Sequence, residues 1–382
     1  MAPLRVLMMG GYRCGKTSAL ASLFDQSING EVNNHFTIAD TTTIQVRDGE
    51  KIDMLSNKRL ELINSIEKGG NNTFLVDQAP TNKYWDYTLK VQIPGNTRKY
   101  LEMVFRDSAG EFFEVGNQYH NDTIAFIQEC DVFVIVVDTP YMMEGTNAEK
   151  EAANVTDSIH TFLTHMNTSK AKQVIFVPVK CEKWVKEGKI DKVTDTVKKL
   201  YAATFNALMA INNIEVSIIP IETAGDIIFE ELREQYILYN NITGKQQKCS
   251  KTSEKSVVLY NGNNYRLTAN DILNEDLEGI FPGTNITRPA AWYSLRHEPK
   301  AEYTPHNCEQ LSLHILRFMF NKQKNETYGG FIGWLLKSFF GTITMEEMEN
   351  ALIELRMANL IKDSGEGITI LKSCYLGINA DK

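Results

Sequence analysis

One short motif near the N-terminus constrains the fold of this chain more than any other feature. Residues 10–17 read Gly-Gly-Tyr-Arg-Cys-Gly-Lys-Thr, which is a complete G-x-x-x-x-G-K-T phosphate loop. An apolar run at residues 4–9 precedes it, and a helical pattern at residues 18–23 follows it. A strand that feeds a glycine loop into a helix N-terminus directs backbone N–H groups and the positive end of the helix dipole at one point. The sequence therefore predicts an α/β protein that binds a nucleoside triphosphate.

The residue types of the motif suit a polyphosphate. Gly10 and Gly15 allow backbone conformations and close approaches that a Cβ atom would block. Lys16 reaches the β and γ phosphates, and the hydroxyl of Thr17 coordinates Mg²⁺. Ser18, the next residue of the helical pattern, joins these four as a predicted nucleotide-binding residue.

The charge balance argues against a broad nucleic-acid surface. The chain has 382 residues, with 40 basic and 48 acidic side chains and a formal net charge of −8. Because a net negative protein has no strong general attraction for phosphate backbones, no nucleic-acid partner is expected. This length suffices for one large domain with insertions or for two domains.

Cysteine usage and apolar segments favour a cytoplasmic protein. The six cysteines are scattered without metal-ligand spacing, and the N-terminus begins a core strand instead of a signal peptide. The longest apolar segment, residues 331–340, is interrupted by Lys337 and has about half the ~20 residues that a bilayer-spanning helix needs. No transmembrane segment is expected. His160 and His165 are five residues apart and share no helix face, so no metal beyond Mg²⁺ is indicated.

Alternating strand and helix patterns predict a doubly wound, mostly parallel sheet. Apolar β-branched runs occur at residues 130–137, 174–179 and 215–221, and helical patterns at 152–165 and 193–209 lie between them. Two further strands, residues 84–93 and 100–106, are joined by a short Pro-Gly-Asn turn and form an antiparallel hairpin.

The second strand of this hairpin ends in Asp107-Ser108-Ala109-Gly110, a D-x-x-G sequence. With this motif in place after the phosphate loop, the chain resembles the TRAFAC class of translation-factor and Ras-like GTPases. The resemblance implies GTP and Mg²⁺ as ligands. It also implies that Asp107 binds Mg²⁺, usually through water, and that the backbone N–H of Gly110 contacts the γ-phosphate.

The base-recognition motif of that class is matched less fully. Where Ras-like proteins carry N-K-x-D, this chain has Val179-Lys180-Cys181-Glu182. The resemblance implies that the stem of Lys180 packs on guanine and that Glu182 accepts from guanine N1 and N2. A later strand end, Thr223-Ala224, resembles the loop that contacts guanine O6 through its backbone. The alternative is a strand that ends in a solvated turn.

Switch and catalytic residues of the class have several candidates here. Thr81, just before the hairpin, is preferred over Thr41 to Thr43 as the switch I threonine that reaches Mg²⁺. Glu111 stands where the class has a water-orienting glutamine, and it acts as a base or points to solvent. Arg13 is either a cis arginine on the transferring phosphoryl group or a partner in a surface ion pair.

The expected organisation is a Ras-like G domain over residues 1–322, with insertions at about 27–80 and 240–300. An Asn-Gly hairpin at 256–267 lies in the second insertion. Residues 323–382 are expected to form a small α+β unit, a helix capped by Thr344 and then a hairpin, which resembles half of a winged helix. Its glutamates make it a poor DNA reader. Apolar residues 328–341 either dock a protein partner or pack on the G domain.

The sequence thus predicts a Mg²⁺-dependent guanine-nucleotide switch that hydrolyses GTP slowly and signals to protein partners at its switch regions and C-terminal unit. Its Lys-Cys-Glu-Lys turn resembles that of the bacterial double-GTPase group of multi-gene systems. Two alternatives remain. One is a nucleotide-stabilised scaffold without turnover, motivated by Glu111, and the other is an ATPase that uses Asp138 at the end of a buried strand.

Overall fold

The structure is a computed structural model of the chain, and its described residues are 3–11, 13–29, 32–40, 43–45, 51–67, 84–92, 100–108, 120–239, 246–250, 256–260, 263–267, 285–296, 302–327 and 345–376. Within these ranges no helix has both the length and the apolar character to cross a membrane.

The described residues form one large sheet of nine strands, in the order β15-β16-β9-β8-β7-β1-β6-β5-β2. The strands of this sheet, in chain order, are β1 (Leu4–Met9), β2 (Thr37–Asp40), β5 (Trp85–Gln92), β6 (Tyr100–Asp107), β7 (Val132–Asp138), β8 (Lys172–Val179), β9 (Ile214–Ile218), β15 (Ser364–Gly365) and β16 (Ile368–Lys372). Strands β6, β1, β7, β8 and β9 run parallel, whereas β5 and β2 at one edge and β16 and β15 at the other pair antiparallel.

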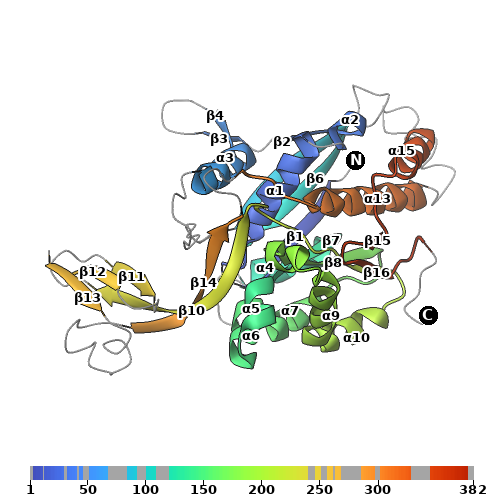
Figure 1. Cartoon of the computed structure of the whole chain (residues 1–382). Coiled ribbons are helices and arrows are strands. Elements are labelled where there is room, and N and C mark those ends of the chain that lie inside the picture. The colour runs from blue at the N-terminus through green and yellow to red at the C-terminus, as the bar shows by residue number, and fades with distance from the viewer. Residues whose placement is uncertain are drawn as a thin grey trace.

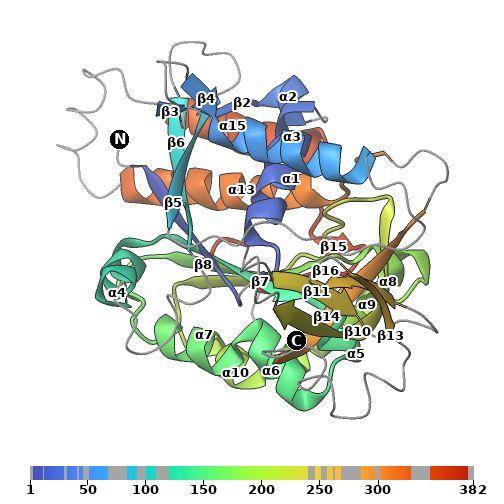
Figure 2. The same cartoon turned by 90° about the vertical axis from the view of Figure 1, so that its left-hand side faces the viewer.

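Helices cover both faces of this sheet, as the side-on view shows, with α1, α13 and α15 on one side and α6, α7 and α10 on the other (Figure 2). The helices are α1 (Lys16–Asn29), α2 (Val32–His35), α3 (Met54–Glu67), α4 (His120–Glu129), α5 (Thr139–Glu144), α6 (Asn147–Asn154), α7 (Thr156–Leu163), α8 (Glu182–Lys186), α9 (Ile190–Leu200), α10 (Ala202–Met209), α13 (Cys308–Thr327) and α15 (Met345–Met357). The expected doubly wound α/β fold is confirmed.

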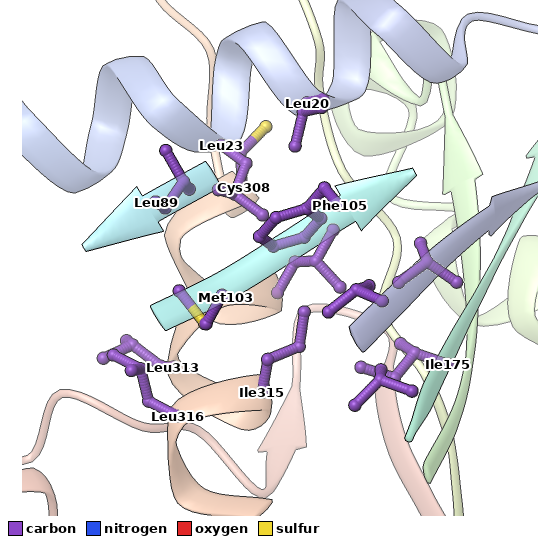
Figure 3. Close-up of a cluster of buried hydrophobic side chains, with 14 of the residues drawn as sticks. Leu20, Leu23, Leu89, Met103, Phe105, Ile175, Cys308, Leu313, Ile315 and Leu316 are labelled. Atoms are coloured by element: carbon purple, nitrogen blue, oxygen red, sulfur yellow. The ribbon is translucent and has the colours of Figure 1, made fainter. Parts of the chain in front are cut away.

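The side-chain alternation of the central strands produces the two cores. In β1, Val6 and Met8 point into one cluster, and Leu7 and Met9 point into the other. Period-two alternation sends successive side chains to opposite faces, so a strand buried on both faces must be apolar throughout. Figure 3 shows part of the first cluster, where Leu20 and Leu23 of α1 pack with Phe105 of β6 and residues of α13 on the same face of the sheet.

Two expected helices are each divided in two. The pattern at 152–165 is interrupted at Val155, which has φ 44° and separates α6 from α7. The buried side chain of Asn154 accepts a hydrogen bond from the backbone N–H of Asp138 at 2.7 Å, and this fixes the chain to the end of β7. The pattern at 193–209 is likewise interrupted at Tyr201, whose hydroxyl donates to the backbone carbonyl of Asn154. Tertiary hydrogen bonds, which periodicity does not report, set both breaks.

The region between α1 and β5 contains an additional sheet strand. Strand β2 pairs antiparallel with β5, and a small hairpin of β3 (Thr43–Gln45) and β4 (Lys51–Asp53) precedes α3. The apolar spacing of residues 51–68 predicts one helix. Met54–Glu67 is that helix, but Lys51–Asp53 is a strand. Strands of three or four residues carry too short a pattern to be predicted.

A long β-ribbon, which the sequence does not predict, starts before the second insertion and continues into it. Strands β10 (Ile227–Tyr239) and β14 (Asn285–Leu295) pair antiparallel, and β11 (Gln246–Ser250) joins β10. The hairpin of β12 (Ser256–Tyr260) and β13 (Asn263–Leu267) has the register expected around the Asn-Gly turn. Figure 1 shows this ribbon extending away from the helices and the main sheet.

The C-terminal helix and hairpin belong to the main sheet and core. Strand β16 pairs with β9, and Leu352, Leu355 and Leu360 lie in the same buried cluster as α13. The division of the chain at residue 322 remains a prediction, and residues 328–341 lie outside the described ranges.

Candidate functional site

The phosphate loop lies between the end of β1 and the start of α1, as its sequence predicts. Lys16 is only 6% exposed, and its Nζ donates to the carbonyl oxygens of Gly10 at 3.0 Å and Gly11 at 2.8 Å. This buried ammonium lies over the loop, within reach of an anion bound to the loop amides.

Gly15 brings the loop against the predicted base-binding segment. Its φ is +109°, a conformation that side chains rarely adopt, and a Cβ atom at this position would lie 3.6 Å from Cε of Lys180. The stem of Lys180 therefore lies beside the phosphate loop, although the two residues are far apart in the sequence.

Thr17 and Asp107 meet at the loop. The Thr17 hydroxyl donates to Oδ2 of Asp107 at 2.5 Å. Asp107 is fully buried at the end of β6, and its Oδ1 has no hydrogen-bond partner among the described residues. Burial raises the pKa of Asp107, although Lys16 opposes this change by favouring the carboxylate.

This pair fits a divalent cation. A hydroxyl oxygen and a carboxylate oxygen are hard ligands of the kind that Mg²⁺ prefers. A buried carboxylate oxygen without a donor carries a desolvation cost that a cation would offset. Asp107 and Thr17 are the described residues that would hold Mg²⁺.

Two further predicted site residues, Arg13 and Ser18, lie on either side of Lys16 in the sequence. Arg13 is exposed, with φ 58°, and the carbonyl of Ser18 accepts the hydroxyl of Ser22 at 2.9 Å. Thr81, Gly110 and Glu111 lie outside the described residues, as do Thr41 and Thr42, whereas Thr43 begins β3.

Lys180 forms an ion pair at the end of β8. It has φ 61°, and its Nζ lies 2.7 Å from Oδ2 of Asp138, at the end of the neighbouring strand β7. Burial is the largest single influence and favours the neutral amine, but Asp138, Tyr293 and Cys14 together outweigh it, so the pKa of Lys180 is raised. The second oxygen of Asp138 accepts from the backbone N–H of Tyr141 and caps α5. Both carboxylate oxygens of Asp138 are therefore engaged.

Glu182 is bound to the segment that contains Thr223 and Ala224. Its Oε1 accepts from the backbone N–H of Ala224 at 2.9 Å and that of Gly225 at 3.4 Å. The side chain is 2% exposed, and burial raises the pKa of Glu182 to about 7. Two residues that sequence reasoning assigned to separate contacts with a base are thus hydrogen-bonded to each other.

The Thr223 segment is also attached to α1. The hydroxyl of Ser22 lies 2.8 Å from the carbonyl oxygen of Thr223 and shares its one proton between this carbonyl and that of Ser18. The hydroxyl of Tyr303 donates to Ser22 at 2.8 Å. Sequence reasoning missed both side chains. Neither belongs to a motif, and Tyr303 follows the second insertion, so no signal in the sequence could have found them.

Strand β10 of the β-ribbon contacts α8, the helix that follows Lys180. Phe229 of β10 stacks on Trp184 of α8 with ring centroids 5.6 Å apart, and Tyr293 of β14 lies 6.0 Å from Phe229 in an edge orientation. The ribbon is therefore fixed to the helix that follows Lys180.

A protein-family sequence model described as DO-GTPase2, Double-GTPase 2, matches residues 5–223. This range includes the phosphate loop, Asp107, Lys180, Glu182 and Thr223. No curated protein sequence matches the chain.

Solved structures with distant likeness include three GTPase-related proteins. The signal recognition particle receptor SRb-GTP/SRX complex from Chaetomium thermophilum is 9% identical with TM-score 0.33, and the match covers 59% of this chain and 93% of that chain. Roco2 RocCORdC from Methanosarcina barkeri, bound to GDP, is 12% identical with TM-score 0.24, covering 58% and 44%. The Ski7 GTPase-like domain from S. cerevisiae, bound to GDP and inorganic phosphate, is 9% identical with TM-score 0.29, covering 78% and 71%. Because these scores are low, the strand order above, and not these likenesses, establishes the fold.

Proposed function

Because the chain belongs to the Double-GTPase 2 family, we propose that it is a Mg²⁺-dependent guanine-nucleotide switch that hydrolyses GTP slowly. The observation that carries the proposal is the meeting of Lys16, Thr17 and Asp107 at one loop, with an unpartnered buried oxygen on Asp107. Lys16 supplies charge to the phosphates, and Thr17 and Asp107 hold the cation, which supplies electrostatic stabilisation to the phosphates when bound.

The base end supports guanine as the base. Lys180 lies beside the phosphate loop, and Glu182 accepts from the backbone N–H groups of Ala224 and Gly225, so guanine binding replaces these hydrogen bonds with contacts to the base. A carboxylate accepts from guanine N1 and N2, and a backbone N–H donates to O6. Adenine carries an amino group in place of O6 and has no N1 proton, so it matches neither contact.

The ATPase alternative assigns Asp138 the role of the acidic strand-end residue. The contacts of Asp138 argue against that role, since one oxygen pairs with Lys180 and the other caps α5. A scaffold without turnover remains the second candidate, because a glutamate, Glu111, stands at the position of the water-orienting glutamine.

We assign slow turnover to the isolated chain and fast turnover to a complex with a protein partner at the switch regions and the C-terminal helix and hairpin. Five cysteines are free, which suits the reducing cytoplasm proposed for this protein: Cys14, Cys130, Cys181, Cys308 and Cys374. The partner assignment rests on the family resemblance and on residues 328–341 of the sequence.

Calorimetric titration of the purified full chain with GTP, GDP and ATP, with and without Mg²⁺, tests the binding part. The proposal expects GTP to bind more tightly with Mg²⁺ than without it, and ATP to bind more weakly than GTP. Equal affinities for ATP and GTP would remove the guanine assignment, and no binding of either would remove the function altogether.

Single-turnover hydrolysis tests the slow-switch part. The expected rate is on the order of 10⁻⁴–10⁻² per second, the range of Ras-like enzymes that act without an activating partner. Turnover of several per second by the isolated chain contradicts it, and bound GTP that stays intact for days favours the scaffold. The full chain is used because Leu352 and Leu355 belong to the core, so truncation before α15 would expose apolar surface.

A further inference from the structure

A short segment after the second insertion lies along the loop that carries Thr223 and Ala224. We call residues 302–306 the strap and residues 222–226 the base loop. They run antiparallel, with Glu222 and His306 exchanging two backbone hydrogen bonds of 3.0 Å and the N–H of Thr304 donating to the carbonyl of Ala224 at 3.2 Å. The strap therefore fixes the base loop as an added strand would.

The contact is too close for a side chain on Gly225. This residue has φ +78°, and a Cβ atom there would lie 2.1 Å from the carbonyl oxygen of Thr304 and 2.2 Å from its hydroxyl. Only glycine permits this approach without displacement of backbone. The strap and base loop are thus built to lie together.

One hydroxyl joins the strap, the base loop and the phosphate-loop helix. Ser22 of α1 is fully buried, accepts from the hydroxyl of Tyr303 in the strap, and lies 2.8 Å from the carbonyl of Thr223 in the base loop. The same helix begins with Lys16 and Thr17 at the phosphate end. The distance between the two ends of the site is therefore fixed through Ser22.

We propose that Ser22 and Tyr303 are positioning residues for the guanine base, an inference that rests on the proposed function. They do not touch the nucleotide themselves. They hold the backbone N–H of Ala224 at a fixed position relative to α1. The base of a nucleotide bound at the phosphate loop then finds this donor already in place. The strap, which comes from the chain following the insertion, takes part in this positioning because Tyr303 belongs to it.

Helix α1 offers a matched control. Ser27 is also fully buried, and its hydroxyl donates to Ser312 of α13 at 3.2 Å, away from the base loop. Ser22→Ala and Ser27→Ala each remove one buried hydroxyl that links α1 to another segment. Both should cost stability, Ser22→Ala the more because its hydroxyl has two partners in other segments and that of Ser27 has one, whereas only Ser22→Ala should alter the base site.

The experiment measures dissociation of a fluorescent GDP analogue from the full chain by stopped flow. Tyr303→Phe should raise the dissociation rate about three- to tenfold, as expected for loss of one neutral hydrogen bond, and Ser22→Ala, which also removes the bond to Thr223, should raise it at least as much. The double variant should be little faster than Ser22→Ala alone, because Ser22→Ala already removes the bond between Tyr303 and Ser22. Affinity for ADP, measured by competition, should change less than twofold, since adenine does not use the Ala224 N–H in this way.

Each outcome separates the two claims. If the unchanged chain binds no GDP, the proposed function fails. If it binds GDP but Ser22→Ala and Tyr303→Phe release it as slowly as Ser27→Ala, the positioning role fails and the proposed function stands. If Ser27→Ala accelerates release as much as Ser22→Ala, the effect is a general loosening of α1 and the inference is also overturned. Thermal unfolding of each variant shows whether it is folded, and Tyr303→Phe preserves nearly all of the side-chain volume.

Discussion

The two ends of the candidate site are built in different ways. The phosphate end is almost contiguous, since among the described residues the segment from Gly10 to Thr17 supplies all of it except Asp107. The base end combines side chains and backbone from four separate segments, which are α1, the region from Lys180 to Glu182, the base loop and the strap. The first follows its motif closely and the second departs from it.

The difference shows which chemistry depends on sequence spacing. Phosphate is bound mainly by consecutive backbone N–H groups and a helix terminus, so the spacing of the glycines and Lys16 cannot vary. A base is recognised by a few hydrogen bonds, which different residues can supply if the fold brings them together. Here a valine, Val179, occupies the asparagine position of the base motif, and the base loop is held instead by Ser22, Glu182 and the strap.

The largest predicted effect is at the phosphate end. Lys16→Ala removes a buried ammonium that would bind phosphate, and charge-assisted hydrogen bonds of this kind contribute about 1.5–3 kcal/mol each. With two such contacts, GTP affinity should fall by roughly 10²–10⁴-fold in calorimetric titration. The matched control is Lys198→Ala, which removes a lysine from α9 that pairs with Asp195. Unchanged affinity in Lys16→Ala would end the phosphate-loop assignment.

The next largest predicted effect concerns recognition of the guanine base by Glu182. Glu182→Ala should reduce the preference for GDP over ADP by about 1–3 kcal/mol, the range for a bidentate contact to a base edge. Affinity for GDP falls while affinity for ADP changes little, so the ratio of the two constants is the measurement. A preference that stays the same would show that Glu182 serves only to fix the base loop.

The same carboxylate predicts a pH dependence. Burial raises the pKa of Glu182 to about 7, so lowering the pH from 8 to 6 should neutralise most of it and weaken guanine preference by up to about tenfold. Stability should change in the opposite direction. Because the folded-state pKa lies above the unfolded value, the folded state binds more protons between about pH 4.5 and 7, and the free energy of unfolding decreases as the pH rises through that window. GDP and ADP are titrated at pH 6 and pH 8 into the unchanged chain and into Glu182→Ala. If Glu182 is the responsible group, the preference of the variant for GDP should not change with pH.

The smallest predicted effect is on the free energy of unfolding, and it is tested by substitutions at two glycines. Gly225→Ala and Gly188→Ala both place a side chain at positive φ, but a Cβ atom at Gly188 meets nothing within 4 Å, whereas at Gly225 it meets Thr304. Gly188→Ala should cost about 1 kcal/mol of unfolding free energy, and Gly225→Ala about 1–2 kcal/mol more, because the strap must move. Urea denaturation measures both. Equal costs would mean that the strap is not tightly held against the base loop.

Much of the central sheet could be predicted from local patterns. The hairpin of β5 and β6, the buried strands β7 and β8 and the Asn-Gly hairpin all occur where their residues indicate, because period-two burial and turn chemistry are local properties. The ribbon strands β10 and β14 were not predicted because they belong to a separate sheet. The alternating strand and helix patterns that predict the main sheet do not include them. The breaks at Val155 and Tyr201 were missed because distant hydrogen bonds cause them.

The sequence by itself determined that this protein has a phosphate loop between a strand and a helix, with an acidic residue at the end of a second strand to face it. It determined this because both features depend on short spacings and on a parallel sheet that brings strand ends together. Only the tertiary structure decided how the base end is assembled. Ser22 and Tyr303 are 281 positions apart, and Glu182 and Ala224 are 42 apart. Hydrogen bonds over such separations depend on how packed helices and an inserted ribbon return the chain to one place, which no local pattern encodes.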